Sequence, residues 1–247
     1  MGSVCTGRHF SVPINPHTVM TSSTTSSVES RGNIALVSKP SVEEGPHHST
    51  QSFFKRAVDI LGALVGLFVL ALFYLPIAIA IRLDSPGPIL YSQERYGLQG
   101  KPFRIWKFRS MVTNADDLKA SVTNEAQGLI FKNEADPRIT QVGKILRKTS
   151  LDEFPQFWNV LKGDMSLVGT RPPTGDEVAH YSDHHWRRLN VKPGITGQWQ
   201  VSGRSAIKDF EDIVELDLHY QTQWTPLYDL QLLVRTVYVL VTKSGAY

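Results

Sequence analysis

The feature that most constrains the fold of this chain is a long stretch without a charged residue, from Ile60 to Ile81. As a helix it would extend roughly 33 Å, because an α-helix rises about 1.5 Å per residue. The hydrocarbon core of a bilayer is about 30 Å thick. We therefore predict a membrane element here, and not the buried helix of a soluble protein.

A proline and the flanking charges indicate how this segment enters the bilayer. Pro76 removes a backbone donor and predicts a kink in the second half of the helix. Lys55 and Arg56 precede the segment and Arg82 follows it, so the positive-inside rule keeps both flanks on the cytoplasmic side. We predict a re-entrant helix hairpin over residues 53–83, with a single span as the alternative.

Two glycines lie about one helical turn apart in this segment. Gly62 and Gly66 form a small-xxx-small pair, a pattern that lets a second helix approach closely. Two interpretations stay open: a seat for the partner helix of a homodimer, or relief of crowding at the bend.

The residues before the membrane segment differ in composition from the rest. Residues 1–52 are poor in apolar runs and rich in Ser, Thr and His, so we predict a disordered tail without a secretory signal. Cys5 is the only cysteine, which excludes a disulfide framework and fits a reducing cytosol. The net charge of +3 is too small to indicate nucleic acid as a partner.

Five cations crowd together just after the membrane segment. Such a cluster favours contact with an anionic surface, either lipid headgroups or phosphates. Ordinary solvated strand faces are the alternative. The five residues are Arg95, Lys101, Arg104, Lys107 and Arg109.

Residues 84–247 alternate between short strands and helices, and we predict that they form a cytoplasmic domain. The aromatic stripe from Phe154 to Leu161 indicates a helix that faces either the core or the membrane interface. Tyr228 to Thr242 is apolar on most faces and predicts an amphipathic helix that lies on the membrane or packs beneath the first helix. The fold class is thus a small, helix-rich α+β domain, membrane-associated through a re-entrant hairpin and amphipathic interfacial helices. The predicted strands are 89–96 and 101–111, the helices 114–126, 140–148, 154–161 and 228–242, and the rigid turns 168–173 and 192–197.

Two adjacent carboxylates, Asp152 and Glu153, precede the aromatic stripe. In one interpretation Ser150 caps the helix and Glu153 reaches back to it, which is a capping box. Carboxylates in a first helical turn also complement the helix dipole in proteins of any function. Both effects are structural, and they require no substrate.

The neighbouring cations support a second interpretation of the same pair. One carboxylate attacks a phosphorus atom as nucleophile, and the other holds a hard cation such as Mg²⁺. Arg147, Arg171 and Arg204 then supply positive charge, because phosphoryl transfer spreads negative charge over several oxygens. Together with a membrane element, this predicts a phosphate carried on a lipid.

From about Phe54 to Tyr247 the chain resembles the bacterial sugar transferases that initiate glycan assembly, the small monotopic polyprenyl-phosphate hexose-1-phosphate transferases. The resemblance rests on ordered motifs: Phe54-Lys-Arg56 with Asp59, Leu83-Asp-Ser-Pro-Gly-Pro88, Gln93-Glu-Arg95, Lys107-Phe-Arg-Ser-Met111, Asp136-Pro-Arg-Ile-Thr140, Thr149-Ser-Leu-Asp-Glu153, Asn159 to Gly169, Arg171-Pro172, Lys192 to Gly197 and Trp199-Gln-Val-Ser-Gly-Arg204. Thr170 stands where the family usually has proline, and the membrane-helix proline lies about one turn later than in many members.

The resemblance implies an enzyme on the cytoplasmic face of the bacterial inner membrane. It would move a hexose 1-phosphate from a UDP-sugar to undecaprenyl phosphate and release UMP. Asp152 would attack the sugar-bearing phosphate to form a covalent intermediate, and Glu153 would help bind Mg²⁺. The resemblance also implies phosphate or nucleotide contacts at four residues: Arg147, Arg171, Gln200 and Arg204.

Two other function classes compete with this prediction. A membrane-anchored scaffold or inactive relative would keep the carboxylate pair only as a helix cap. A module that binds nucleic acid or lipid headgroups rests on the basic cluster alone. The sequence contains no residue that identifies the sugar, and the resemblance favours glucose or galactose.

Overall fold

One long helix dominates this computed structural model, which describes residues 45–203 and 206–242. Helix α1, Phe53–Asp84, contains the uncharged stretch. Within the described part of the chain, no other helix is long and apolar enough to cross a membrane. Only 17% of the most apolar window of α1 is buried, so most of α1 lies outside the core of the domain.

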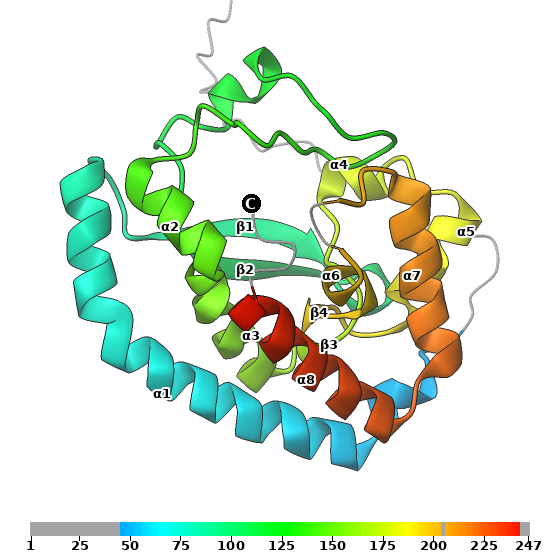
Figure 1. Cartoon of the computed structure of the whole chain (residues 1–247). Helices are drawn as coiled ribbons and strands as arrows, with labels where there is room; N and C mark the ends of the chain where they lie inside the picture. The colour runs from blue at the N-terminus through cyan, green and yellow to red at the C-terminus, as the bar shows by residue number, and fades with distance from the viewer. Residues whose placement is uncertain (1–44, 204–205, 243–247) are drawn as a thin grey trace, which may run out of the picture. The chain divides into compact units, whose positions relative to one another are not determined.

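Shorter helices and two small sheets make up the rest of the described chain (Figure 1). Strands β1, Leu90–Tyr96, and β2, Pro102–Phe108, form the predicted antiparallel hairpin. Strands β3, Ser166–Val168, and β4, Gly194–Thr196, form a parallel pair where the sequence predicted only turns. The α-helices are α2 (Gln141–Thr149), α3 (Phe157–Lys162), α4 (Gly175–Val178), α5 (Asp183–Trp186), α6 (Gln198–Val201), α7 (Phe210–Gln223) and α8 (Pro226–Thr242), and the 3-10 helices are η1 (His48–Gln51), η2 (Leu98–Gly100), η3 (Asp117–Ser121), η4 (Leu151–Gln156) and η5 (Arg187–Asn190).

The predicted helix over residues 114–126 is wrong. Only η3 forms there, and Asn124 ties the following loop together with its side chain. Its Nδ2 donates to the carbonyl of Ile130, and its Oδ1 accepts from the backbone N–H of Lys132 at 2.9 Å each. Asparagine side chains compete with helical hydrogen bonds in this way.

The predicted tail is also too long at its C-terminal end. Residues 45–52 are folded, because they contain η1, and the backbone N–H of His47 donates to the carbonyl of Asn190 at 2.8 Å. Residues 1–44 of the predicted tail, Cys5 among them, lie outside the described residues.

Buried polar contacts fix the beginning of α1 to the domain. Lys55 Nζ donates to Asp229 Oδ2 on α8 at 2.6 Å and to the carbonyl of Val168 at 2.9 Å. The carboxylate of Asp59 accepts from Ser166 Oγ on β3. Arg56 donates to two carbonyls at the end of α3. The first turns of α1 therefore touch α3, α8 and β3 together.

The end of α1 is fixed to the same domain. Arg109, which follows β2, donates to the carbonyls of Pro86 and Ser85 at 2.6 Å each. Asp84 Oδ2 accepts from the backbone N–H of Val142 on α2 at 2.9 Å. Figure 1 shows the result: α1 runs beneath α3 and α8 and then turns toward α2.

The glycine pair of α1 faces the domain. A Cβ atom on Gly62 would collide with the side chain of Leu167 on β3, and one on Gly66 would collide with the ring of Phe157 on α3. The glycines therefore let the backbone of α1 approach these two side chains. This face is occupied by the chain itself, so it cannot seat the partner helix of a homodimer.

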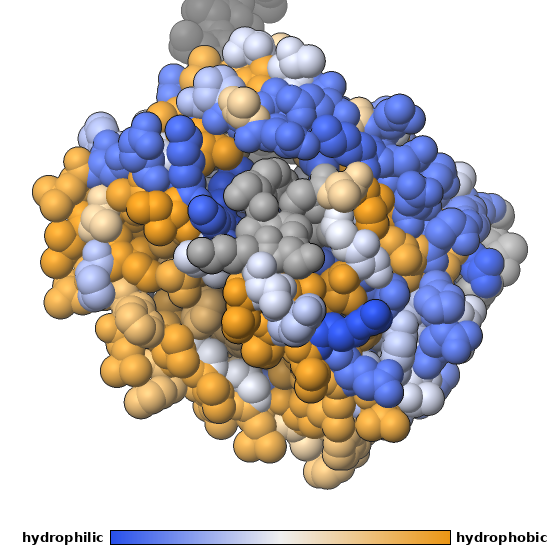
Figure 2. Space-filling model, in the orientation of Figure 1, coloured by the Kyte–Doolittle hydropathy of each residue, from blue (hydrophilic) through white to orange (hydrophobic). Residues whose placement is uncertain are grey.

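The outward faces of α1 and α8 carry a broad apolar surface. Figure 2 shows hydrophobic residues gathered over these two helices, while the opposite part of this view is mostly hydrophilic. Helix α8 confirms the predicted helix over residues 228–242, and it buries Asp229 and Leu232. The exposed side chains on the two helices include Leu61, Leu64, Val65, Phe68 and Leu72 on α1 and Leu227, Val234, Val237, Tyr238 and Val241 on α8.

Candidate active site

The carboxylate pair lies on η4, immediately after α2. Helix α2 ends because Ser150 adopts the left-handed conformation, with φ of 55°. Ser150 makes no side-chain capping bond to η4, so the capping-box interpretation is wrong. Successive residues of a 3-10 helix are about 120° apart, and the two carboxylates therefore point in different directions: Asp152 is buried, whereas Glu153 is partly exposed.

A lysine from the β-hairpin holds the second carboxylate. Lys107 Nζ on β2 lies 3.0 Å from Glu153 Oε1, and both side chains are partly exposed. The prediction from the sequence assigned Lys107 to a cluster of five cations and did not pair it with Glu153. The two residues are far apart in the chain, so only the packing of β2 against η4 reveals the pair.

The five cations after α1 do not share one surface. Arg109 donates to carbonyls at the end of α1, and Arg95 donates to the carbonyl of Pro172 at 3.0 Å. Lys107 forms an ion pair with Glu153. Of these five, only Lys101 and Arg104 are exposed. The prediction of one anion-binding cluster is therefore wrong, because Arg95 and Arg109 donate to backbone carbonyls in different parts of the domain and Lys107 donates to Glu153.

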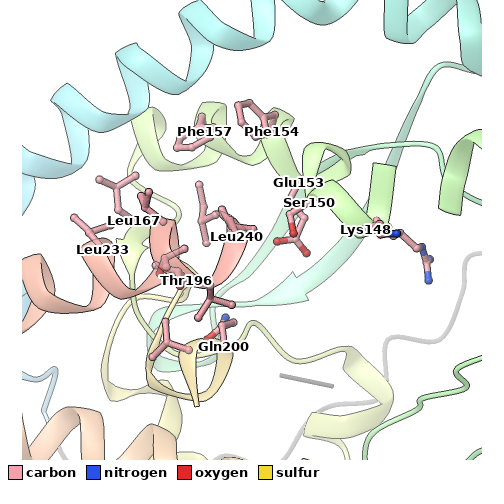
Figure 3. Close-up of a pocket in the computed structure, with 16 residues that line it drawn as sticks. Lys148, Ser150, Glu153, Phe154, Phe157, Leu167, Thr196, Gln200, Leu233 and Leu240 are labelled. Carbon is pink, nitrogen blue, oxygen red and sulfur yellow. Dashed lines mark hydrogen bonds between the residues drawn. The ribbon is translucent and has the colours of Figure 1, made fainter. Parts of the chain in front are cut away.

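A cavity of about 290 Å³ opens beside Glu153. Arg147, from the last turn of α2, lines it, and its Nε donates to Ser110 Oγ at 2.9 Å. Gln200 on α6 lines it as well. Its Oε1 is buried and has no hydrogen-bond partner among the described residues. Figure 3 shows Glu153 and Gln200 on different walls of the same cavity. Three predicted site residues thus meet here.

Arg171 is engaged elsewhere, with a carboxylate that the sequence analysis missed. Its guanidinium donates to both oxygens of Glu177 on α4, at 2.7 and 3.1 Å. Burial opposes the charge on Glu177, but Arg171 and then Arg95 outweigh it and hold the pKa of this carboxyl below its ordinary value. No spacing rule singles out Glu177, which follows Arg171 on a different element.

Arg95 connects this ion pair to the site. Burial, and then the charge of Arg171, lower the pKa of Arg95 to about 10, while Glu177 and Glu153 act in the opposite direction. The two arginines thus lie within electrostatic reach of each other and of Glu177, and Arg95 also lies within reach of Glu153. Arg204, another predicted contact, lies outside the described residues.

A metal ion is expected at Glu153 from the family resemblance. Among the described residues, no group of three or more His, Cys, Asp or Glu side chains gathers to hold one. Glu153 still fits Mg²⁺, because this ion keeps several waters and is bound by one or two carboxylates together with substrate phosphates. This carboxylate is therefore suited to an ion that arrives with a phosphorylated substrate.

Comparison with known proteins identifies the family. Residues 50–243 match the family model described as bacterial sugar transferase. This chain belongs to that family. Its curated relatives include the galactosyl transferase CpsE of Streptococcus agalactiae, which is 50% identical over 78% of this chain and 43% of its own length.

Two further relatives differ in how much of their own length the chain covers. The undecaprenyl-phosphate galactose phosphotransferase of Salmonella typhimurium is 42% identical over 79% of this chain and 42% of its own length. The exopolysaccharide production protein ExoY of Sinorhizobium fredii is 35% identical over 78% of this chain and 88% of its own length. The chain thus spans less than half of the first two relatives and most of ExoY.

The ion pair on α4 predicts how stability depends on pH. Because the folded-state pKa of Glu177 is lowered, its charge stabilises the fold above the unfolded pKa of about 4.5, and this contribution is lost as pH falls below that value. Glu177→Gln leaves two arginines uncompensated and should cost about 3 kcal/mol at pH 7. Thermal unfolding measured over a pH series should show that the stability difference between the parent and Glu177→Gln becomes smaller below pH 4.5. The control is Asp176→Asn, whose side chain is 83% exposed; an equal loss in both variants would contradict a special role for Glu177.

Proposed function

We propose that this chain moves a hexose 1-phosphate from a UDP-sugar to undecaprenyl phosphate and releases UMP. This would be the first membrane step in the synthesis of an exopolysaccharide or another surface glycan. One observation carries the proposal: Glu153, adjacent to Asp152, lines a cavity in which cationic and apolar side chains meet. The names of similar proteins agree, since they specify undecaprenyl phosphate with galactose or glucose.

The proposed reaction has two displacements at one phosphorus atom. A carboxylate oxygen of Asp152 attacks the phosphorus that carries the sugar, the bond to the bridging oxygen breaks, and UMP leaves. The hexose phosphate stays on Asp152 as an acyl phosphate. A phosphate oxygen of undecaprenyl phosphate then attacks the same phosphorus, which frees the carboxylate and forms undecaprenyl diphosphate hexose.

The residues around the pair take supporting roles in this proposal. Lys107 holds Glu153 in place at 3.0 Å, and Arg147 supplies positive charge at the mouth of the cavity. Mg²⁺ bound at Glu153 would neutralise part of the diphosphate charge. Gln200, with a buried oxygen that lacks a partner among the described residues, is suited to accept a hydrogen bond from the sugar or the nucleotide. Family resemblance extends the nucleotide and phosphate contacts to Arg171 and Arg204.

The rival proposal, an inactive scaffold, loses one of its two supports, the capping box, whereas the helix-dipole role of the carboxylates is unaffected. The capping box requires a side-chain bond from Ser150 to η4, and Ser150 makes no such bond. Glu153 instead pairs with Lys107 at the edge of the cavity.

The re-entrant topology is part of the proposal and is supported by the two ends of α1. A straight helix of 32 residues separates its ends by roughly 48 Å. Lys55 at the beginning and Asp84 at the end nevertheless bind the same domain. A helix that crossed the bilayer would carry one of these ends to the far side, whereas a helix that enters one leaflet and returns keeps both ends at the domain. Pro76 lies inside this helix and favours the necessary bend.

The domain organisation follows from this topology. Residues 53–83 form the membrane element, and residues 84–247 form the catalytic domain on the cytoplasmic face of the inner membrane, with residues 1–52 as the segment that precedes them. The exposed apolar faces of α1 and α8 support a location at the bilayer.

Replacement of the proposed nucleophile tests the reaction. Asp152→Asn keeps the size of the side chain but removes the attacking anion, so UMP release from UDP-glucose or UDP-galactose should fall by about three orders of magnitude or more. The assay contains Mg²⁺ and undecaprenyl phosphate. Asp117→Asn, a change at an exposed residue of η3, is the matched control and should retain activity. Near-normal UMP release from a folded Asp152→Asn protein would refute the mechanism.

Cysteine labelling tests the topology. In a Cys5→Ser background, single cysteines at Gly45 and Ser121, both exposed in the structure, flank α1 on its two sides. A reagent that cannot cross the membrane should label neither position in intact cells and both after lysis. Labelling of position 45 alone in intact cells would show a simple span.

A further inference from the structure

The cavity beside Glu153 has mostly apolar walls. Phe154 and Phe157 form one side, β3 and β4 contribute Leu167 and Ile195, and α8 covers the other side with a row of side chains. That row consists of Leu233, Thr236, Val237, Val239 and Leu240. Apart from Gln200, these walls offer few polar partners to a nucleotide or a sugar. A hydrocarbon chain that enters would instead remove its apolar surface from water.

The two hydroxyl groups in these walls are already used. Thr196 and Thr236 approach each other with their Oγ1 atoms at 2.7 Å, and Thr236 also donates to the carbonyl of Leu232 at 2.7 Å. They link α8 to β4 across the cavity floor. The interior between the aromatic wall and α8 therefore behaves as an apolar slot.

One end of the cavity is charged. Glu153, Arg147 and Lys148 line it there, and Figure 3 shows Glu153 and Ser150 at one end and Leu167 and Leu233 at the other. A ligand that fills the cavity therefore has an anionic group near Arg147 and Lys148, beside Glu153, and a hydrocarbon chain along α8.

The outer side of the same helix continues into the apolar surface. Val234 and Val241 on α8 are 70% and 75% exposed, and Figure 2 shows the hydrophobic residues of α8 and α1 on one face. A long chain that leaves the cavity along α8 thus passes directly onto the surface proposed to enter the bilayer.

The volume of the cavity limits how much of a long chain it holds. An apolar cavity of about 150 Å³ in another protein binds one benzene molecule, so about 290 Å³ accommodates roughly ten carbon atoms by the same scale. We propose that this cavity binds the first two isoprene units of the polyprenyl phosphate acceptor, next to its phosphate, and leaves the remaining units in the bilayer.

This inference rests on the proposed function, and it names where the acceptor is recognised. A bilayer phospholipid fits less well, because its phosphate is a diester and its chains begin beyond a glycerol. The phosphate at the charged end must be a terminal one if it is to reach the carboxylate pair. The occupant is therefore the reacting lipid itself.

Direct binding tests the inference without any turnover. Affinities of the full chain in detergent are measured by calorimetry for inorganic phosphate, geranyl phosphate with two isoprene units, and farnesyl phosphate with three. Geranyl phosphate should bind at least about tenfold more tightly than inorganic phosphate, and farnesyl phosphate should gain about twofold at most over geranyl phosphate.

Two valines on α8 supply a matched pair of variants. Val237 lines the cavity, whereas Val234, one turn earlier, does not, and both are largely exposed. Val237→Trp should weaken geranyl phosphate binding by about tenfold and leave inorganic phosphate unchanged, and Val234→Trp should alter neither by more than about twofold. The pair Val237→Gln and Val234→Gln repeats the comparison with a polar side chain if the tryptophan variant does not fold.

Three results would overturn the inference. They are unchanged geranyl phosphate binding in both Val237 variants, equal losses in the Val237 and Val234 variants, and displacement of geranyl phosphate by phosphatidylglycerol as readily as by farnesyl phosphate. Failure of the parent protein to release UMP from any UDP-sugar would instead refute the proposed function, and the binding result would stand apart from it.

Discussion

The arrangement of the site depends on one buried ion pair, between Lys55 at the start of α1 and Asp229 on α8, at 2.6 Å. A buried pair is costly to desolvate, so its value lies in what it fixes. Lys55 also donates to the carbonyl of Val168, and Tyr220 donates to Asp229 at 2.8 Å. Because α1, β3, α7 and α8 meet at this point, the membrane helix and the wall of the cavity are positioned by the same contacts.

The elements that meet at this ion pair also form the walls of the cavity. Helix α8 leaves the ion pair and covers the apolar cavity, while the glycine face of α1 packs against Leu167 and Phe157, which also line that cavity. Glu153 closes the charged end. The proposed reaction joins a water-soluble nucleotide sugar to a membrane lipid, and it needs a site where both environments meet. The described contacts provide such a border.

Sequence reasoning recovered the features that depend on local pattern. The apolar length of α1, the β-hairpin and the Asp152–Glu153 pair are all encoded in short segments. It missed the pairs that packing creates: Lys107 with Glu153, and Arg171 with Glu177. It also took five cations for one cluster because they are close in sequence, although Arg95 donates to the carbonyl of Pro172 and Arg109 donates to that of Pro86. The cap predicted for Ser150 failed because a left-handed residue redirects the chain there.

The proposed reaction requires Asp152 to carry the sugar phosphate from the nucleotide sugar to the lipid. Intact-mass measurement of the protein after incubation with Mg²⁺ and UDP-galactose or UDP-glucose, without polyprenyl phosphate, tests it directly. A covalent intermediate on Asp152 predicts a mass increase of one hexose phosphate on the peptide that contains Asp152. This added group should be lost when undecaprenyl phosphate is supplied. An unmodified protein that releases UMP only in the presence of the lipid would contradict it.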